Sequence, residues 1–250
     1  MEDTNIIELK DLCMDFKMAV EPCDSLKERV VRGLQGRNEY RILHALQDIT
    51  LNVKSGEVLG IVGSNGSGKS TLLKIIAGVL KQTKGELKVD KRKVQLLTLG
   101  TGFDRELTAK ENVYLNGSLI GYSKAFLDQH YEKIVEFAEL EGFMNEKIKK
   151  FSSGMSARLG FAIATAGDFK DILVLDEVLS VGDMAFRRKS GRRIHELIHG
   201  GATVLMVSHS TETIISHCSR VVWLEKGILK MDGAPEAVCQ SYRSYMNAKA

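Results

Sequence analysis

The sequence predicts an α/β fold whose central sheet is mainly parallel. Three continuous apolar runs, at residues 58–62, 172–175 and 203–207, have the length of strands and no polar alternation. Such runs are typical of strands that are buried on both faces of a parallel sheet, and helical patterns separate them. The strand signal is missing between residues 107 and 166, so we expect a helical subdomain inserted into the α/β core.

Composition and charge exclude several classes of protein. The chain has 250 residues, of which 44% are apolar and 27% are charged, so we expect neither a disordered nor a fibrous protein. Its 35 basic and 32 acidic residues leave a formal charge of +3, which is too small for a protein that coats nucleic acid. No run approaches the roughly 18–20 apolar residues that cross a bilayer. The acidic N-terminus does not resemble a signal peptide, and the 4 cysteines form no Cys-x-x-Cys pair, so we expect no zinc site and a reduced, cytosolic compartment.

The N-terminal part of the chain predicts a strand at residues 6–12 and, before the next strand, an insertion at residues 17–43. Residues 25–28 form a capping-box pattern, and the helix that follows has one apolar face rimmed by basic side chains until Gly36 ends it. Two interpretations remain open. The helix packs against its own domain, or it lies against membrane headgroups or a membrane-embedded partner.

A glycine-rich loop lies between the first buried strand and a helical pattern. Its sequence fits G-x-x-x-x-G-K-[ST] in full. The glycines allow backbone amides to point inward at phosphate oxygens, and the helix N-terminus adds its partial positive charge. We expect Lys69 to reach the β and γ phosphates and Ser70 to ligate Mg²⁺. The predicted nucleoside triphosphate site comprises Gly63, Ser64, Asn65, Gly66, Ser67, Gly68, Lys69, Ser70 and Thr71.

Two carboxylates, Asp176 and Glu177, follow the apolar run at residues 172–175. Because this run and the glycine-rich loop belong to the same predicted sheet, we expect Asp176 to hold the magnesium shell and Glu177 to polarise the attacking water. The sequence has no Asn-Lys-x-Asp motif, which recognises guanine, so it does not favour a GTPase.

The predicted helical subdomain contains three helices. Residues 108–111 form a capping box that opens the first helix, and Ser123 caps the second. The third helix, at residues 156–164, follows a Ser-Ser-Gly sequence at residues 152–154. Amides and a hydroxyl at such a helix start can bind an anion, so we expect a second anion site there.

Together these motifs resemble those of the nucleotide-binding subunit of an ABC transporter, and the resemblance covers nearly the whole chain. Residues 151–155 resemble the signature motif, residues 180–183 the D-loop, and Ser208-His209 the segment with the switch histidine. The resemblance implies a P-loop NTPase (RecA-like) core, an N-terminal antiparallel β region and the inserted helical subdomain.

The resemblance also implies ATP and Mg²⁺ as ligands and assigns roles to individual residues. Glu177, His209 and Lys69 would act in catalysis, and Ser70 and Asp176 would hold the metal. Because the phosphate loop and the signature serve opposite faces of ATP in this family, the working unit would be a head-to-tail homodimer with sandwiched ATP. The remaining residues implied to contact nucleotide are Ser152, Ser153, Gly154, Asp183 and, as the aromatic that stacks on adenine, Phe16, with Tyr40 in reserve.

Three features resemble more specifically the ATPases that export O-antigen, capsular polysaccharide or teichoic acid. The signature has Ser-Ser-Gly-Met, residues 97–103 lead into a pattern at 106–117 that is typical of that group, and residues 176–183 replace the commoner Asp-Glu-Pro-Thr form. The chain would therefore hydrolyse ATP at the cytoplasmic side of the membrane, bound to a transmembrane permease, to move a lipid-linked glycan. Two alternatives stay open: an ABC subunit for a lipid or drug, and a non-transport ABC ATPase.

The sequence departs from the ABC pattern at the Q-loop, and it also indicates where the parts of the domain begin and end. The Q-loop glutamine of ordinary ABC ATPases falls at Leu99, and Gln95 is out of register, so no residue is assigned that role. We expect one nucleotide-binding domain at 1–250. Only residues 247–250 follow the pattern of the last helix, so glycan recognition would lie in the permease or in the lipid-linked end of the polymer that is presented to it. The expected parts are an α/β core at 1–106 and 167–234, the subdomain at 107–166 and a C-terminal helix at 235–250.

Overall fold

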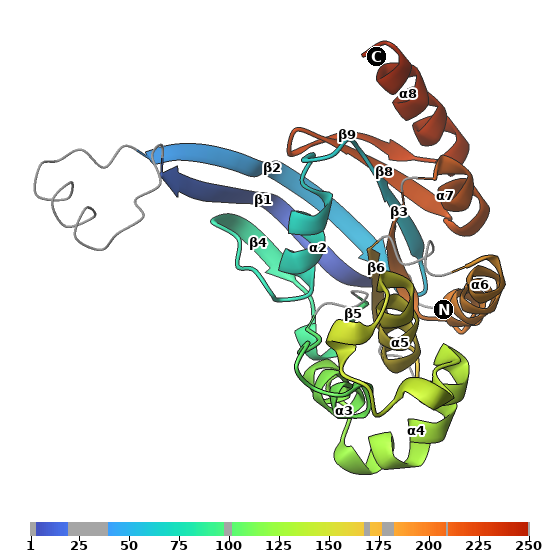
Figure 1. Ribbon diagram of the computed structural model, residues 1–250. Coiled ribbons are helices and arrows are strands. Elements are labelled where there is room, and N and C mark those ends of the chain that lie inside the picture. Colours follow the sequence, from blue (N-terminus) through green and yellow to red (C-terminus); the bar gives the residue numbers. More distant parts are fainter. Residues whose placement is uncertain are drawn as a thin grey trace, which may run out of the picture.

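The computed structural model describes residues 4–19, 40–97, 102–167, 171–176, 183–208 and 210–249. A six-stranded sheet lies at the centre, in the order β5-β6-β7-β3-β8-β9, and all neighbouring strands are parallel except β8 and β9 (Figure 1). The strands are β3 (Val58–Val62), β5 (Val94–Leu97), β6 (Ile172–Asp176), β7 (Thr203–Val207), β8 (Arg220–Glu225) and β9 (Ile228–Gly233).

The strands of this sheet send alternate apolar side chains to its two faces. In β6, Ile172 and Val174 belong to the hydrophobic core on one face, whereas Leu173 and Leu175 belong to the core on the other. The same alternation holds in β7. The prediction that continuous apolar runs mark strands buried on both faces is therefore confirmed.

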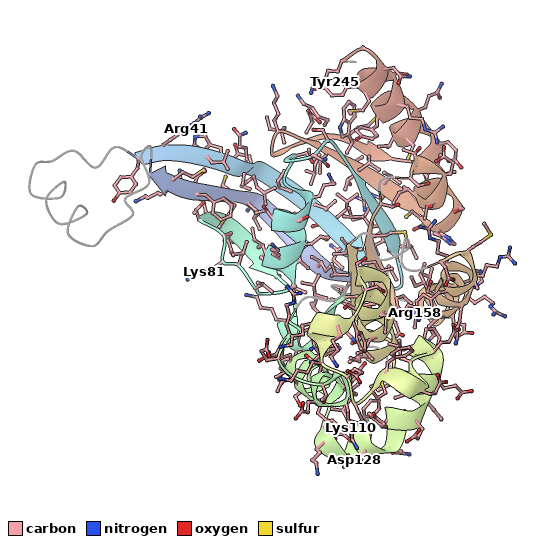
Figure 2. The ribbon with its side chains drawn as sticks, viewed as in Figure 1. Arg41, Lys81, Lys110, Asp128, Arg158 and Tyr245 are labelled. Atoms are coloured by element: carbon pink, nitrogen blue, oxygen red, sulfur yellow. The ribbon has the colours of Figure 1, made fainter. Side chains whose placement is uncertain are left out.

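A three-stranded antiparallel sheet and one helix cover the first face. The sheet has the order β2-β1-β4, and its first two strands form a long ribbon that extends to the left in Figure 1, with Arg41 near the outer end of β2 in Figure 2. The N-terminal antiparallel region implied by the family resemblance is thus present. The elements are β1 (Asn5–Ala19), β2 (Tyr40–Lys54), β4 (Lys84–Lys88) and α2 (Lys69–Ile76).

The predicted bounds of the N-terminal insertion, residues 17–43, are wrong. The ladder between the two long strands continues through the pair Phe16 and Leu43 to the pair Ala19 and Tyr40, so residues 17–19 and 40–43 are strand. Cross-strand pairing extends the strands past the point where the apolar pattern of the sequence stops. The helix predicted from residue 25 to Gly36 lies outside the described residues.

Four helices cover the second face of the central sheet. The aromatic rings of Phe161 and Phe186 meet edge to face in this second core, with their centroids 6.0 Å apart. Cys218 and Cys239 are buried in the same core. The helices are α5 (Ser153–Ala164), α6 (Met184–His199), α7 (Thr211–His217) and α8 (Pro235–Asn247).

The helical subdomain has its own core, formed by α3 (Ala109–Ile120), α4 (Lys124–Ala138) and part of α5. Both predicted caps are confirmed: Thr108 and Glu111 form the reciprocal capping box, and Ser123 accepts from the Phe126 amide. Short 3₁₀ turns connect elements at η1 (Lys91–Lys93), η2 (Glu141–Phe143) and η3 (Ile148–Lys150). No helix in the described ranges has the length and apolar character needed to cross a membrane.

The third helix of the subdomain begins earlier than predicted. We expected its start at residue 156, but α5 begins at Ser153 because the hydroxyl of Ser152 accepts a hydrogen bond of 3.1 Å from the amide of Met155. This cap satisfies one of the free amides of the first turn, so the Ser-Ser-Gly sequence lies inside the helix start rather than before it.

Candidate functional site

The loop between β3 and α2 has a backbone that requires glycine. Gly63, Gly66 and Gly68 have φ values of 155°, 75° and 105°, which side chains disfavour. A Cβ atom at Gly63 would lie 2.1 Å from the carbonyl oxygen of Leu224, and one at Gly68 would lie 2.6 Å from that of Ala45. The loop therefore packs directly against the end of β8 and against β2.

The inner side of this loop offers unpaired donors. The hydroxyl of Ser67 is buried and has no hydrogen-bond partner among the described residues, which is costly unless a ligand or water pairs with it. Gly68, the N-cap of α2, supplies no side chain to the free amides of the first turn. A Cβ atom at Gly66 would meet nothing within 4 Å, so space lies beside the loop. A phosphate group fits this combination of donors, helix dipole and space.

Lys69 is held over the loop. Its side chain is buried, and its ammonium donates hydrogen bonds to the carbonyl oxygens of Gly63, at 2.7 Å, and Ser64, at 2.9 Å. The predicted phosphate-binding cation is thus already placed beside the loop that would hold the phosphates. Among the other predicted residues of the site, Asn65 and Ser70 are exposed, while Ser64 and Thr71 are half-buried.

The register of the central sheet brings the predicted acidic residues to the same edge as the loop. Asp176 pairs with Val207, and Val207 pairs on its other side with Ile61, which precedes the loop by two residues. Two strand spacings of about 5 Å each therefore separate the backbones of Asp176 and Ile61. The side chain of Asp176 and all of Glu177 and His209 lie outside the description, so their predicted roles remain predictions.

The predicted second anion site is at the start of α5. Ser152 and Ser153 are exposed and Gly154 is half-buried. The Ser152 hydroxyl already accepts from the Met155 amide, so its oxygen acts as a helix cap and its O–H remains able to donate.

Asp183, predicted as the D-loop residue near nucleotide, caps α6. One carboxylate oxygen accepts from the amides of Ala185, at 3.0 Å, and Phe186, at 2.9 Å. The hydrogen bond from Phe186 in particular holds the pKa of the Asp183 carboxyl below its usual value. The carboxylate therefore fixes the start of α6, while its exposed side remains open to a ligand or partner.

The two candidate aromatic residues for adenine lie on the β1–β2 ribbon. Phe16 is half-buried, pairs with Leu43 and packs against the first core. Tyr40 lies at the outer end of the ribbon and is 56% exposed. The two candidates therefore differ in their surroundings: Phe16 packs against the core, whereas Tyr40 is exposed to solvent. The assignment of Phe16 to adenine remains a prediction.

Gln95, which is out of register for the Q-loop, has a structural role. It is buried in β5, and its side-chain amide donates to the carbonyl oxygen of Ala164 in α5 at 3.2 Å. This contact joins β5 to the end of α5. Leu99 lies outside the described residues.

Sequence reasoning missed a residue that contacts the phosphate loop. The hydroxyl of Ser64 donates a hydrogen bond of 2.9 Å to the carboxylate of Glu225, the last residue of β8, which is only 2% exposed. An acidic residue after the apolar run of β8 is the only sequence signal, and it is indistinguishable from an ordinary solvated strand end. The contact spans 161 positions of the chain, so nothing local could reveal it.

Comparison with known proteins identifies a family and similar relatives. Residues 46–180 match the sequence profile of the family described as ABC transporter. The chain is 43% identical over 219 residues to the O-antigen export system ATP-binding protein RfbB of Klebsiella pneumoniae, covering 88% of this chain and 87% of that protein. It is 36% identical over 247 residues to the teichoic acids export ATP-binding protein TagH of Enterococcus faecalis, covering 99% of this chain and 54% of TagH.

Solved structures share the fold. The dimeric, post-hydrolysis structure of the ATP-binding cassette MJ0796 bound to ADP and Pi has a TM-score of 0.70 to this chain at 26% identity. The alignment covers 92% of this chain and 98% of that one. The mainly parallel sheet, the N-terminal antiparallel sheet and the helical subdomain are therefore parts of a shared architecture.

Proposed function

This chain belongs to the ABC transporter family, and we propose that it is the ATP-hydrolysing subunit of an exporter for O-antigen, teichoic acid or a related lipid-linked polysaccharide. The observation that carries the ATPase part is the phosphate loop, with its three left-handed glycines and the unpaired, buried hydroxyl of Ser67. The identity to RfbB and TagH supports the class of substrate.

The proposed chemistry rests on the phosphate loop, on the position of Asp176 in the sheet and on the family resemblance of the residues that follow. Lys69 and the loop amides would bind the β and γ phosphates, and Ser70 and Asp176 would hold Mg²⁺, which neutralises phosphate charge when bound. Glu177, the residue after Asp176 at the edge of the sheet, would take the proton of the attacking water. His209 follows β7 by two residues and would contact the γ phosphate from the same edge.

We also propose that two copies bind ATP between them. Ser152, Ser153, Gly154 and Asp183 lie at the starts of α5 and α6, where the first two and Asp183 are exposed. Free amides at the start of α5 would bind the phosphates of a nucleotide held by the other copy, and Asp183 would lie near that nucleotide at the start of α6. The dimeric state of the MJ0796 cassette supports this arrangement.

A transmembrane permease would complete the exporter. RfbB is described as part of an export system, which supports a separate permease as the partner of this chain. The chain would then lie on the cytoplasmic side of the membrane, where ATP is available, and the lipid-linked glycan would be handled by the assembled transporter.

The test has a biochemical and a cellular part. The full chain should hydrolyse ATP only with Mg²⁺, and Glu177→Gln should slow hydrolysis strongly while binding persists. Cells that carry Glu177→Gln as their only copy should retain the lipid-linked polymer inside and lose it from the surface, as measured by glycan blotting of surface and internal fractions. Normal surface polymer in these cells would exclude the proposed class of substrate, whatever the ATPase result.

A further inference from the structure

The buried carboxylate of Glu225 joins the phosphate loop to the segment that contains α8. One carboxylate oxygen accepts from the Ser64 hydroxyl at 2.9 Å. The other accepts from the ammonium of Lys249, at 2.9 Å, and from the phenol of Tyr245, at 3.2 Å. Each oxygen therefore has a partner, and the two sets of partners come from different parts of the fold.

The contact of α8 with β8 holds these partners in place. Tyr245 lies on the side of α8 that faces the sheet (Figure 2), and its ring meets Trp223 of β8 at a centroid distance of 5.0 Å. The Lys249 ammonium lies 4.6 Å from the centre of the Tyr245 ring. Two residues before Tyr245, Arg243 donates to the hydroxyl of Thr211 on α7 at 2.6 Å. The docking of α8 thus determines where the phenol and the ammonium meet Glu225.

The phosphate loop, in turn, rests on the end of β8. A Cβ atom at Gly63 would clash with the carbonyl oxygen of Leu224, and the amide of Gly227 donates to the carbonyl oxygen of Ser67 at 2.9 Å. Together with the Ser64 contact, these interactions join the loop to residues 224–227 at three points. A shift of Glu225 would therefore change the position of most of the loop.

Ser64 connects this support to the predicted phosphate-binding cation. Its hydroxyl is held by Glu225, while its carbonyl oxygen accepts from the ammonium of Lys69 at 2.9 Å. A continuous set of charged and polar contacts therefore runs from Lys249 through Glu225 and Ser64 to Lys69. Because the Glu225 carboxylate at the centre of this set is buried, its contacts depend on one another, and removing one partner leaves it incompletely satisfied.

We propose that Glu225 is a positioning residue for the phosphate loop, and that Tyr245 and Lys249 couple the docking of α8 to the affinity of that loop for Mg-ATP. This inference rests on the proposed function, because it concerns regulation of the same nucleotide site. Displacement of the α8 segment by a partner would weaken nucleotide binding, and by thermodynamic reciprocity bound nucleotide would strengthen the docking of α8.

The test is a double-mutant cycle on the full chain, with the dissociation constant for Mg-ATP measured by calorimetry. Lys249 is 46% exposed, so Lys249→Met should fold, and we expect it to raise the dissociation constant roughly threefold to tenfold. Ser64→Ala should raise it by a similar factor. In the Ser64→Ala background, Lys249→Met should have a clearly smaller effect on ATP affinity, because the side-chain contact between Glu225 and the loop is already broken and only the backbone contacts with residues 224–227 remain.

The controls separate coupling from general stability. Lys230→Met removes an exposed lysine of β9 and should leave the dissociation constant unchanged. Any loss of melting temperature in Lys249→Met should persist in the Ser64→Ala background, whereas the effect on ATP affinity should become clearly smaller. Glu225→Gln provides a second variant, with an expected rise in the dissociation constant of roughly tenfold.

Two results would overturn the inference: an unchanged dissociation constant in both Lys249→Met and Glu225→Gln, or an effect of Lys249→Met that is fully retained without the Ser64 hydroxyl. Failure of the proposed function looks different. A wild-type chain that binds Mg-ATP with the expected coupling but does not hydrolyse it would contradict the ATPase assignment and leave the positioning role supported.

Discussion

The hydroxyl of Ser64 donates a hydrogen bond of 2.9 Å to the carboxylate of Glu225, which lies 161 positions further along the chain. The first residue belongs to the loop that would bind phosphate, and the second ends a central strand of the same sheet. The candidate nucleotide site is therefore supported by β8 and, through Glu225, by the segment that contains α8.

Replacement of Glu177 by Gln should slow steady-state ATP hydrolysis by roughly 10²–10⁴-fold, because the variant keeps the shape of the side chain but cannot accept the proton of water. Binding of Mg-ATP should persist. Phosphate release is the measurement, and Glu236→Gln, which removes an exposed carboxylate on α8, is the matched control. Wild-type turnover in Glu177→Gln would contradict the assignment.

The Glu177→Gln chain should form dimers that depend on ATP, because unhydrolysed nucleotide would remain between two copies. Ser152→Arg should abolish these dimers by placing a bulky side chain at the start of α5. Sedimentation velocity with and without ATP measures the effect. Ser118→Arg adds the same side chain to an exposed site on α3 and should leave the dimers intact. Dimers that ignore nucleotide and Ser152 would exclude the sandwich.

Replacement of two helix glycines by alanine should change the free energy of unfolding in opposite directions. Gly117→Ala in α3 places a Cβ atom 2.5 Å from the fully buried Leu127 side chain, so it should lower the free energy of unfolding by about 1–3 kcal/mol. Gly191→Ala in α6 meets no atom within 4 Å and should raise it by about 0.5–1 kcal/mol through helix propensity. Urea unfolding of the two variants measures both values, and a shared sign would contradict the packing described at Gly117.

The stabilising contribution of Glu225 should depend on pH in a defined direction. Burial raises the pKa of this carboxyl, but the hydrogen bonds and charge of Lys249 and the hydrogen bond of Ser64 outweigh burial, so the pKa lies below the ordinary 4.5. Stability from a lowered carboxyl pKa is fully present above the unfolded value and is lost as pH falls through the folded value. The stability difference between wild type and Glu225→Gln should therefore be constant above about pH 5.5 and shrink below pH 4.5. A difference that grows on acidification would show that another group dominates.

The buried thiols should react slowly in the native protein. Burial, with a smaller effect of the nearby Cys239, raises the pKa of the Cys218 thiol to about 12, so little thiolate exists at pH 8. Cys218 and Cys239 should be alkylated much more slowly than the half-buried Cys13, and denaturant should remove the difference. Peptide mapping after timed alkylation measures each rate. Fast native labelling of Cys218 would contradict its burial.

The sequence by itself determined the features that depend on neighbouring residues. The capping box of Thr108 and Glu111 and the cap at Ser123 are confirmed because their hydrogen bonds join residues three positions apart. The strand at residues 58–62 is also confirmed, because a continuous apolar run of this length between glycine-containing turns is typical of a strand in a sheet with two covered faces. The phosphate loop was predictable for the same reason, since its glycines and its lysine are contiguous.

Only the tertiary structure decided which distant residues meet. Strand order places Glu225 beside Ser64 and turns Gln95 toward Ala164, and no local pattern encodes either neighbour. The N-terminal ribbon extended past its predicted bounds because cross-strand pairing, rather than apolar periodicity, continued to Ala19 and Tyr40. Spacing along a chain limits contacts within a helix or turn, whereas contacts between strands depend on the packing of the whole sheet, which side-chain burial and backbone pairing settle together.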